Sequence, residues 1–278
     1  LALIAAPFLG FYPVFVMKVM CFALFACAFN LLLGYTGLLS FGHAAFLGGS
    51  AYVTGHVLKV WGLTPELGLI VGTLFGAGLG LVFGWLAIRR QGIYFSMITL
   101  ALAQMIYFVA LQAKFTGGED GLQAVPRGHL FGLIDLKSDI TMYYVALAIV
   151  VAAFLLIART VHSPFGQVLK GIKENEPRAI SLGYDVNRFK LLAFVISAAL
   201  SGLAGSLKTL VLGFASLSDV HWTASGQVIL MTLVGGLGTL SGPLVGSAVV
   251  VLLENKIGDF GTFLARVTGV NWFSTLGE

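Results

Sequence analysis

The feature that most constrains this chain is a succession of apolar runs, each about 20 residues long, separated by short polar loops. Helices of that length cross the hydrocarbon core of a bilayer, where only helices and closed barrels satisfy their backbone groups. The runs are continuous rather than alternating, which favours helices over a membrane barrel. Charged residues make up 10% of the 278 residues, against about 25% in soluble domains. The sequence therefore predicts an integral membrane protein.

Six runs predict uninterrupted spans, at 14–33, 41–58, 66–88, 92–113, 140–158 and 191–212. A seventh run, 225–254, contains GGLGTLSGP at 235–243. Because Gly and Pro break a helix, we expect two short helices or a re-entrant pair there. The expected fold class is all-α, a polytopic helical membrane protein with a broken or re-entrant helix pair. The chain begins inside an apolar run without an initiator Met and stops at Glu278 without a closing feature, so we expect the native protein to be longer at both ends.

Basic residues orient the expected spans. Arg89 and Arg90 form a short loop without an acidic residue, and the loop 159–190 holds six Lys or Arg against three acidic residues. Cytoplasmic loops are enriched in Lys and Arg. Two expected spans separate these loops, so both are assigned consistently to the cytoplasmic side. The segment 114–139, with four acidic residues, then faces outward.

The stretch NLLLGYTGLLSFGHAAFLGGSAYVTG begins at Asn30 and is rich in glycine and hydroxyl groups. Irregular backbone at membrane depth is tolerated where it is buried in protein or lines a cavity, and broken helices contact solutes in transporters. We expect Ser40 to cap a helix starting near Phe41, with His43 in its first turn. The residues expected to line or shape a pathway are Asn30, Tyr35, Thr36, Gly37, Ser40 and His43. For His43 the alternative is a structural histidine bonded to a backbone carbonyl.

The loop 159–190 predicts two short helices. Ser163 and Pro164 are typical of a helix start, and this helix should run to about Glu174. NEPRAISLG repeats the pattern, with Asn175 or Glu176 as cap and Gly183 just past the end. Ala179, Ile180 and Leu182 would then be exposed among charges. Two capped helices favour a docking element over a solvated loop.

Other polar and small residues have simpler interpretations. Gly72, Gly76, Gly80 and Gly84 form a small-residue stripe that predicts close helix packing. Lys18 and, near a span end, Glu254 are the charges expected inside spans, and Lys18 should snorkel outward. Cys21 and Cys27 do not share a helix face and are expected as buried small side chains. The sequence shows no Cys/His metal spacing and no P-loop.

Four stretches stand out in order along nearly the whole chain: NLLLGYTGLLSFGHAAFLGGSAY, TGGEDGLQAVP, GQVLKGIKENEPRAISLGYDVNRFKLLAFVISAALSGLAGSL and GGLGTLSGPLVGS. Together they resemble the permease subunits of branched-chain amino acid ABC importers, the LivM type. The resemblance implies one transmembrane permease domain over 1–278 with a coupling loop at 159–190, in the bacterial inner membrane. The function it implies is transport rather than catalysis: half of an ATP-driven pathway for branched-chain or related hydrophobic amino acids.

The resemblance also implies partners. These are a sibling permease subunit in a heterodimer, two cytoplasmic ATPase subunits and a periplasmic solute-binding protein, together with the lipid bilayer and without nucleic acid. It makes 173–185 the coupling helix that meets the ATPase. The residues involved would be Glu174, Asn175, Glu176, Arg178, Ala179, Leu182 and Gly183. The chain itself would bind no cofactor, and ATP and Mg would be used by the partner ATPase subunits.

Three alternatives stay open. A urea or short-amide importer permease would look much the same. A stand-alone secondary transporter or channel should show inverted repeats and paired ionisable groups within its spans. An intramembrane enzyme would need Ser40 and His43 as nucleophile and base, which their spacing of three permits on a helix, but no orienting carboxylate is evident.

Overall fold

The structure, a computed structural model, describes residues 12–90, 92–130, 132 and 134–268. Its helices are α2 (Pro13–Thr36), α3 (His43–Lys59), α4 (Pro65–Ala87), α5 (Ile93–Gln112), α6 (Asp139–His162), α7 (Pro164–Glu174), α8 (Glu176–Ser181), α9 (Val186–Leu212), α10 (Trp222–Gly235) and α11 (Gly242–Thr268). Short 3₁₀ turns, η2 (Lys114–Thr116), η3 (Gly118–Asp120) and η4 (Leu217–Asp219), and an antiparallel pair, β1 (His129–Leu130) with β2 (Ile134–Asp135), complete the described elements. The all-α expectation is confirmed.

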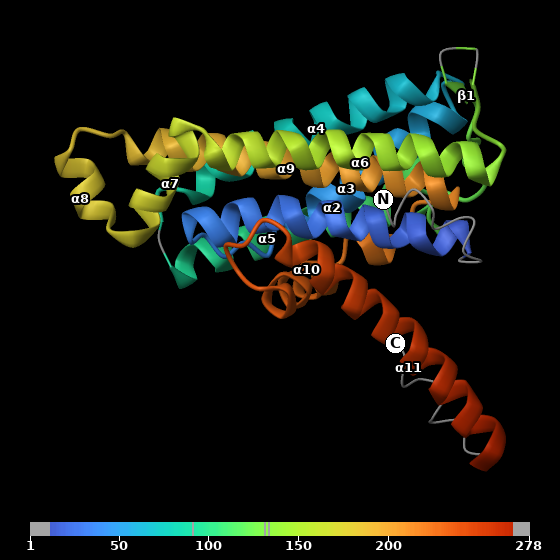
Figure 1. The fold of residues 1–278 in the computed structure, drawn as a ribbon. Helices are drawn as coiled ribbons and strands as arrows, with labels where there is room; N and C mark the ends of the chain where they lie inside the picture. The colour runs from blue at the N-terminus through green and yellow to red at the C-terminus, as the bar shows by residue number, and fades with distance from the viewer. Residues whose placement is uncertain (1–11, 91, 131, 133, 269–278) are drawn as a thin grey trace.

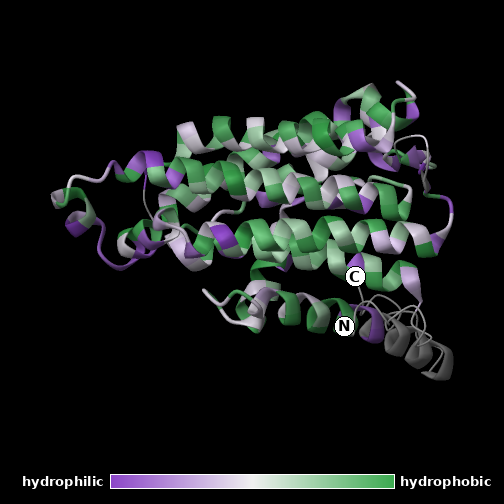
Figure 2. Ribbon diagram, turned by 45° about the horizontal axis from the view of Figure 1, so that its top comes forward, coloured by the Kyte–Doolittle hydropathy of each residue, from purple (hydrophilic) through white to green (hydrophobic). Residues whose placement is uncertain are grey.

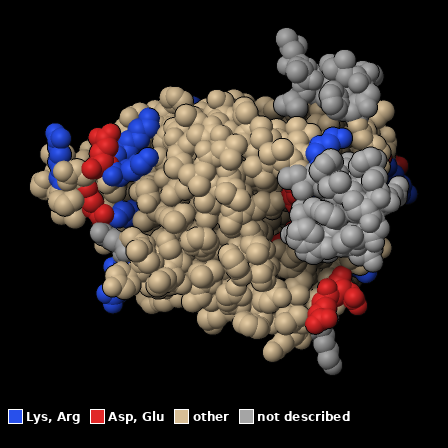
Figure 3. Space-filling model, turned by 90° about the horizontal axis from the view of Figure 1, so that it is seen from below, with Lys and Arg blue, Asp and Glu red and all other residues tan. Residues whose placement is uncertain are grey.

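Length and composition set the architecture. Five described helices, α2, α4, α5, α6 and α9, are long and apolar enough to cross a membrane. They run roughly side by side with α3 in one bundle (Figure 1). Hydrophobic residues fill the middle of the bundle and hydrophilic ones gather toward its ends (Figure 2). On the face drawn in Figure 3, the visible Lys, Arg, Asp and Glu residues lie toward the two ends of the bundle. The visible surface of the band between the ends is formed by other residue types. A bilayer fits that band.

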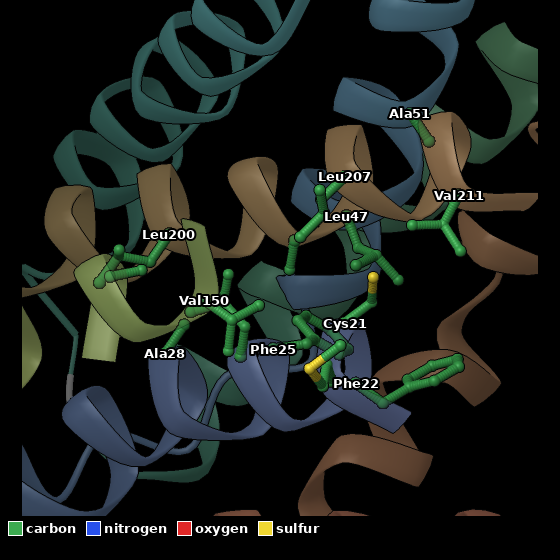
Figure 4. Close-up of a cluster of buried hydrophobic side chains, with 14 of the residues drawn as sticks. Cys21, Phe22, Phe25, Ala28, Leu47, Ala51, Val150, Leu200, Leu207 and Val211 are labelled. Carbon is green, nitrogen blue, oxygen red and sulfur yellow. The ribbon is translucent and has the colours of Figure 1, made fainter. Parts of the chain in front are cut away.

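Helix α2 lies at the centre of the bundle. In its most apolar stretch, 78% of the residues are buried inside the protein, against 28% in α5 and 33% in α4 and α6. Its side chains Phe22 and Phe25 belong to one buried cluster with Leu47 of α3 and Leu207 of α9, part of which is drawn in Figure 4. A helix that is apolar all round is buried by protein in this way, whereas α4, α5 and α6 keep an apolar face for lipid.

The glycine stripe of α4 is a packing surface, as expected. A Cβ at Gly76 would lie 2.9 Å from the Ala198 carbonyl oxygen, and one at Gly80 would lie 2.4 Å from the Ala198 Cβ. The absence of side chains lets α4 and α9 approach closely. Both cysteines are buried and free, as expected for small core side chains.

The connections that the distribution of charged residues assigned to opposite sides of the membrane lie at opposite ends of the bundle. The α4–α5 connection, which contains Arg89 and Arg90, lies at the same end as α7 and α8 (Figure 1). The β1–β2 hairpin of the segment 114–139 lies at the other end. The hairpin itself was not expected; it pairs His129 with Asp135 and Leu130 with Ile134.

Three sequence-based boundaries differ from the structure. Helix α2 continues through Gly34 to Thr36 and ends at Gly37, which adopts φ 75°, so the break lies further along than expected. Helix α3 begins at His43 with Gly42 as its N-cap, and Ser40 does not cap it. The interruption at 235–243 does separate two helices, α10 and α11, but α11 has 27 residues and is not short.

Candidate functional site

The backbone between α2 and α3, residues 37–42, is held by hydroxyl groups from two other helices. Ser96 of α5 donates to the Leu39 carbonyl at 2.6 Å, and Thr99 of α5 accepts from the Phe41 amide at 3.2 Å. Ser225 of α10 donates to the Phe41 carbonyl at 2.7 Å and accepts from the Ala44 amide at 2.9 Å. Non-helical backbone away from water needs such partners. The bonds tie the irregular segment to α5 and α10.

Asn30 connects α2 to the break between α10 and α11. Its Oδ1 accepts from the Gly238 amide at 3.0 Å, and its Nδ2 donates to the Thr239 carbonyl at 2.8 Å. The side chain is 3% exposed. The Asn30 amide therefore satisfies one backbone donor and one backbone acceptor that have no helical partners, in the turn between α10 and α11. It also brings the glycine-rich stretch that begins at Asn30 into contact with the interruption at 235–243.

His43 is fully buried between α2, α3 and α9. Ser197 of α9 donates to the Ala28 carbonyl at 2.6 Å, so its oxygen accepts from His43 Nε2 at 2.9 Å. The proton is thereby assigned to Nε2, and Nδ1 has no hydrogen-bond partner among the described residues. The ring stands edge-on to Phe29, Phe46 and Phe194, with centroids 4.9, 5.4 and 6.0 Å away.

Ser40 and His43 do not form a nucleophile–base pair. The Ser40 oxygen is buried and accepts from the Gly42 amide at 3.1 Å, while the bonded nitrogen of His43 faces Ser197. The geometry that general-base activation needs is therefore not present between them.

The end of α2 rests on α7. Lys173 donates from Nζ to the Gly34 carbonyl at 2.7 Å, and its Cγ would lie 3.3 Å from a Cβ at Gly37. Lys170 places its Nζ 5.7 Å from the centre of the Tyr35 ring. Thr36 donates to its own helix, at the Leu32 carbonyl. Two lysines at a helix C-terminus complement its free carbonyls and its dipole.

Helices α7 and α8 project from the end of the bundle (Figure 1), with the predicted caps. Ser163 accepts from the Gly166 amide at 3.4 Å and Asn175 from the Arg178 amide at 3.1 Å. Gly183 follows α8 with φ 89°. The expected exposure is right for Ile180 and Leu182, which are 58% and 68% exposed.

Ala179 differs from the expectation because it is buried. It packs with Ile172 and Val186 in a small cluster that joins α7, α8 and the start of α9. Glu176 turns back to Lys190 of α9, with Nζ and Oε2 2.7 Å apart. These contacts make the protrusion one folded unit. A groove of about 330 Å³ between α7 and α8 is lined by, among others, Glu174, Asn175, Arg178 and Leu182.

A larger pocket, of about 1070 Å³, lies between α2, α9, α10 and α11. Four charged side chains line it: Lys18, Lys208, Asp219 and Glu254. Lys208 and Asp219 form a buried ion pair. Sequence reasoning missed this pair and placed no charge in the span 191–212. The sequence did contain signals for this pair. Lys208 is a charged residue near the end of the apolar run 191–212, and Asp219 lies six residues after Gly213, the first glycine beyond that run.

The segment 213–221 brings Asp219 into the bundle. It leaves the end of α9 at Gly213 and pairs Ala215 with Leu122. It then turns inward, so that a Cβ at Gly48 in α3 would lie 2.6 Å from the Val220 amide nitrogen. Helix α10 therefore starts inside the bundle, and its N-terminal residues Trp222 to Ala224 border the pocket.

This bundle of apolar helices, with a broken helix pair inside it, defines a multi-pass helical membrane protein. A family model described as "Branched-chain amino acid transport system / permease component" matches residues 14–274, and the chain belongs to that family. No solved structure matches the chain.

Three relatives illustrate the range of similarity. The high-affinity branched-chain amino acid transport system permease protein LivM of Escherichia coli (strain K12) is 28% identical over 273 residues, covering 90% of this chain and 64% of the relative. A probable branched-chain amino acid transport permease protein LivH of Methanocaldococcus jannaschii is 28% identical, covering 74% and 67%. The ribose import permease protein RbsC of Bacillus subtilis (strain 168) is 27% identical, covering 76% and 66%. The chain thus spans somewhat less than two thirds of the LivM relative.

Proposed function

We propose that the chain is the membrane-spanning permease subunit of an ATP-driven importer in a bacterial inner membrane. It forms half of a pathway for branched-chain or related hydrophobic amino acids. Membership of the permease family and the names of the LivM and LivH relatives support this substrate class. The chain acts as a transporter and not as an enzyme. A sibling permease, two ATPase subunits and a periplasmic binding protein complete the complex, and the ATPase subunits use the ATP and Mg²⁺.

The observation that carries the proposal is the folded protrusion of α7 and α8. It presents Ile180 and Leu182 to the surroundings beyond the end of the bundle, and apolar side chains on a small rigid element favour a protein partner. The coupling residues are Glu174, Asn175, Glu176, Arg178, Ala179, Leu182 and Gly183. Of these, the buried Ala179 and the paired Glu176 hold the element in shape, and the others surround the contact with the ATPase.

A chain of direct contacts supports a route from this surface into the membrane. Lys173, in the last turn of α7, bonds to Gly34 at the end of α2. One turn back in α2, Asn30 holds the turn between α10 and α11. A displacement of α7 by the ATPase would therefore move the end of α2 and, through Asn30, the broken helix pair. Transport then follows from switching between two packings of the bundle.

In this scheme, the residues predicted to line or shape the pathway act by shaping the non-helical segment 37–42 between α2 and α3. Gly37 ends α2, Tyr35 and Thr36 form its last turn, and Ser40 holds the Gly42 amide. His43, sealed by aromatic rings, fixes α3 against α9. Asn30 is the member whose contacts reach a second broken element.

The test is Leu182→Glu in the complex assembled from all subunits. We expect labelled-leucine uptake to fall about tenfold or more, because the substitution places a charge where the proposed contact with the ATPase would bury the Leu182 side chain. Leu63→Glu, at an exposed leucine between α3 and α4, is the matched control and should leave uptake unchanged. Equal uptake by Leu182→Glu and wild type would refute the docking role.

Substrate class is tested by uptake of labelled leucine, urea and ribose into vesicles containing the wild-type complex. Leucine uptake that depends on ATP and on the binding protein is expected. Uptake of urea or ribose instead of leucine would contradict the amino-acid assignment. If the ATPase subunits still copurify with the chain in that case, the substrate assignment is wrong and the partner assignment stands.

A further inference from the structure

The pocket between α2, α9, α10 and α11 combines two kinds of surface. Its walls include the aromatic rings of Phe22 and Trp222 and the aliphatic side chain of Leu230. Its charged groups are two lysines and two carboxylates, and their formal charges balance. A site that is neutral overall but carries separate full charges suits a ligand with one charge of each sign rather than an ion.

The four charges are not equivalent. Lys208 and Asp219 pair with each other, each with 9% of its side chain exposed, and the Lys208 ammonium also lies 5.1 Å from the centre of the Phe22 ring. This pair satisfies itself and lines the pocket. Lys18, one turn before Phe22 on α2, makes no hydrogen bond or ion pair within the described part of the chain.

Lys18 thus has no partner among the described residues, and ionisable side chains within membrane-spanning helices mark ligand or ion paths. Glu254 of α11 lines the same pocket and carries the opposite charge. Its Oε2 accepts from Gln227 Nε2 at 2.9 Å, which fixes the carboxylate and leaves further acceptor positions free. The N-terminus of α10 adds a weak positive end to the same space.

We propose that this pocket binds a zwitterionic amino acid with an apolar side chain. Lys18 binds the ligand carboxylate, Glu254 binds the ligand ammonium, and the side chain lies against Phe22, Trp222 and Leu230. The Lys208–Asp219 pair lines the pocket and does not bind the ligand directly. The inference rests on the proposed function, and it predicts that urea and sugars, which lack both full charges, leave Lys18 uncompensated and bind poorly.

The binding test uses the assembled complex with a reporter thiol in the pocket. Gly226 lines the pocket, and a Cβ there meets no atom within 4 Å, so Gly226→Cys places a thiol in open space. Leucine should slow labelling of this thiol by a charged thiol reagent. 4-Methylpentanoate, which lacks the ammonium, and isopentylamine, which lacks the carboxylate, should protect much less, and urea and ribose not at all.

Two further substitutions assign the roles. Lys18→Met and Glu254→Gln, each with Gly226→Cys, should raise the leucine concentration needed for half-protection about tenfold or more, since each removes a charge-assisted bond. Lys18→Arg keeps the charge and should retain most protection, which covers the case in which Lys18→Met fails to assemble. Lys137→Met, at an exposed lysine outside the pocket, should leave the half-protection concentration unchanged.

The outcomes separate this inference from the proposed function. Leucine import by the wild-type complex without leucine protection of the thiol would overturn the site and leave the function standing. Equal protection by urea, or unchanged protection in Lys18→Met, would overturn the zwitterion assignment. Absence of any amino-acid import would overturn the proposed function itself.

Discussion

At the scale of single residues, polar side chains in this bundle mainly satisfy backbone that the helices leave unpaired. Asn30, Ser96 and Ser225 each bond to carbonyls or amides of interrupted segments. His43 belongs to this group through Ser197, which links it to the Ala28 carbonyl of α2. In a medium without water these bonds decide which helix packs where.

Ser197→Ala tests this role. The substitution removes the acceptor of the His43 Nε2–H and leaves a buried donor unsatisfied, so we expect a loss of about 1–3 kcal/mol in the free energy of unfolding. The measurement is unfolding of the purified chain in detergent. Ser201→Ala is the control, because among the described residues the Ser201 hydroxyl bonds only within its own helix, to the Ser197 carbonyl; a loss as large as that of Ser197→Ala would contradict the account.

At the scale of helices, small residues set which elements meet. Gly72, Gly76 and Gly80 of α4 face α3 and α9, whereas Gly78 of the same helix faces no neighbour within 4 Å. These three glycines therefore have a packing function that Gly78 lacks.

Gly76→Ala should destabilise the protein by about 1–3 kcal/mol, because its Cβ would push the backbones of α4 and α9 apart. Gly78→Ala is the matched control, and we expect it to be neutral or to stabilise by up to about 1 kcal/mol through helix propensity. Denaturant titration in detergent measures both. A smaller effect at Gly76 than at Gly78 would show that the stripe does not carry the contact.

Sequence patterns predicted the helices well and their partners poorly. Apolar runs located α4, α5 and α6 within a few residues, because lipid-facing helices are defined by composition alone. Ser163 and Asn175 predicted the caps of α7 and α8 correctly, since capping is local. The ion pair of Lys208 with Asp219 and the contact of Lys173 with Gly34 were missed, because each depends on how segments fold back in space. Ser40 was misassigned for a related reason: the helix starts two residues after the position that local sequence favours.

At the scale of the whole molecule, the described contacts join the two ends of the bundle through its centre. The protrusion of α7 and α8 touches α2, α2 holds the α10–α11 turn, and α10 borders the charged pocket nearer the other end. Helix α2 is the buried element that all these parts share.

Lys173→Met tests whether this connection transmits motion. We expect the complex to assemble and hydrolyse ATP, while labelled-leucine uptake per ATP falls several-fold, because the bond between α7 and the end of α2 is lost. Lys137→Met, which removes an exposed lysine elsewhere, is the control. Uptake and hydrolysis that fall together in Lys173→Met would indicate loss of assembly instead, and unchanged uptake per ATP would exclude the route.

The ion pair of Lys208 with Asp219 also gives the biosynthesis of the chain an order. Lys208 leaves the ribosome 11 residues before Asp219, so α9 is complete while its ammonium still lacks a counter-charge. A lysine in hydrocarbon costs about 2.5–3.5 kcal/mol, and near the end of a helix it reaches toward the interface instead. Its partner arrives when 213–221 turns back toward Gly48 of α3. Helix α9 therefore cannot bury Lys208 in its paired form until the segment 213–221 has been made and has folded back against α3.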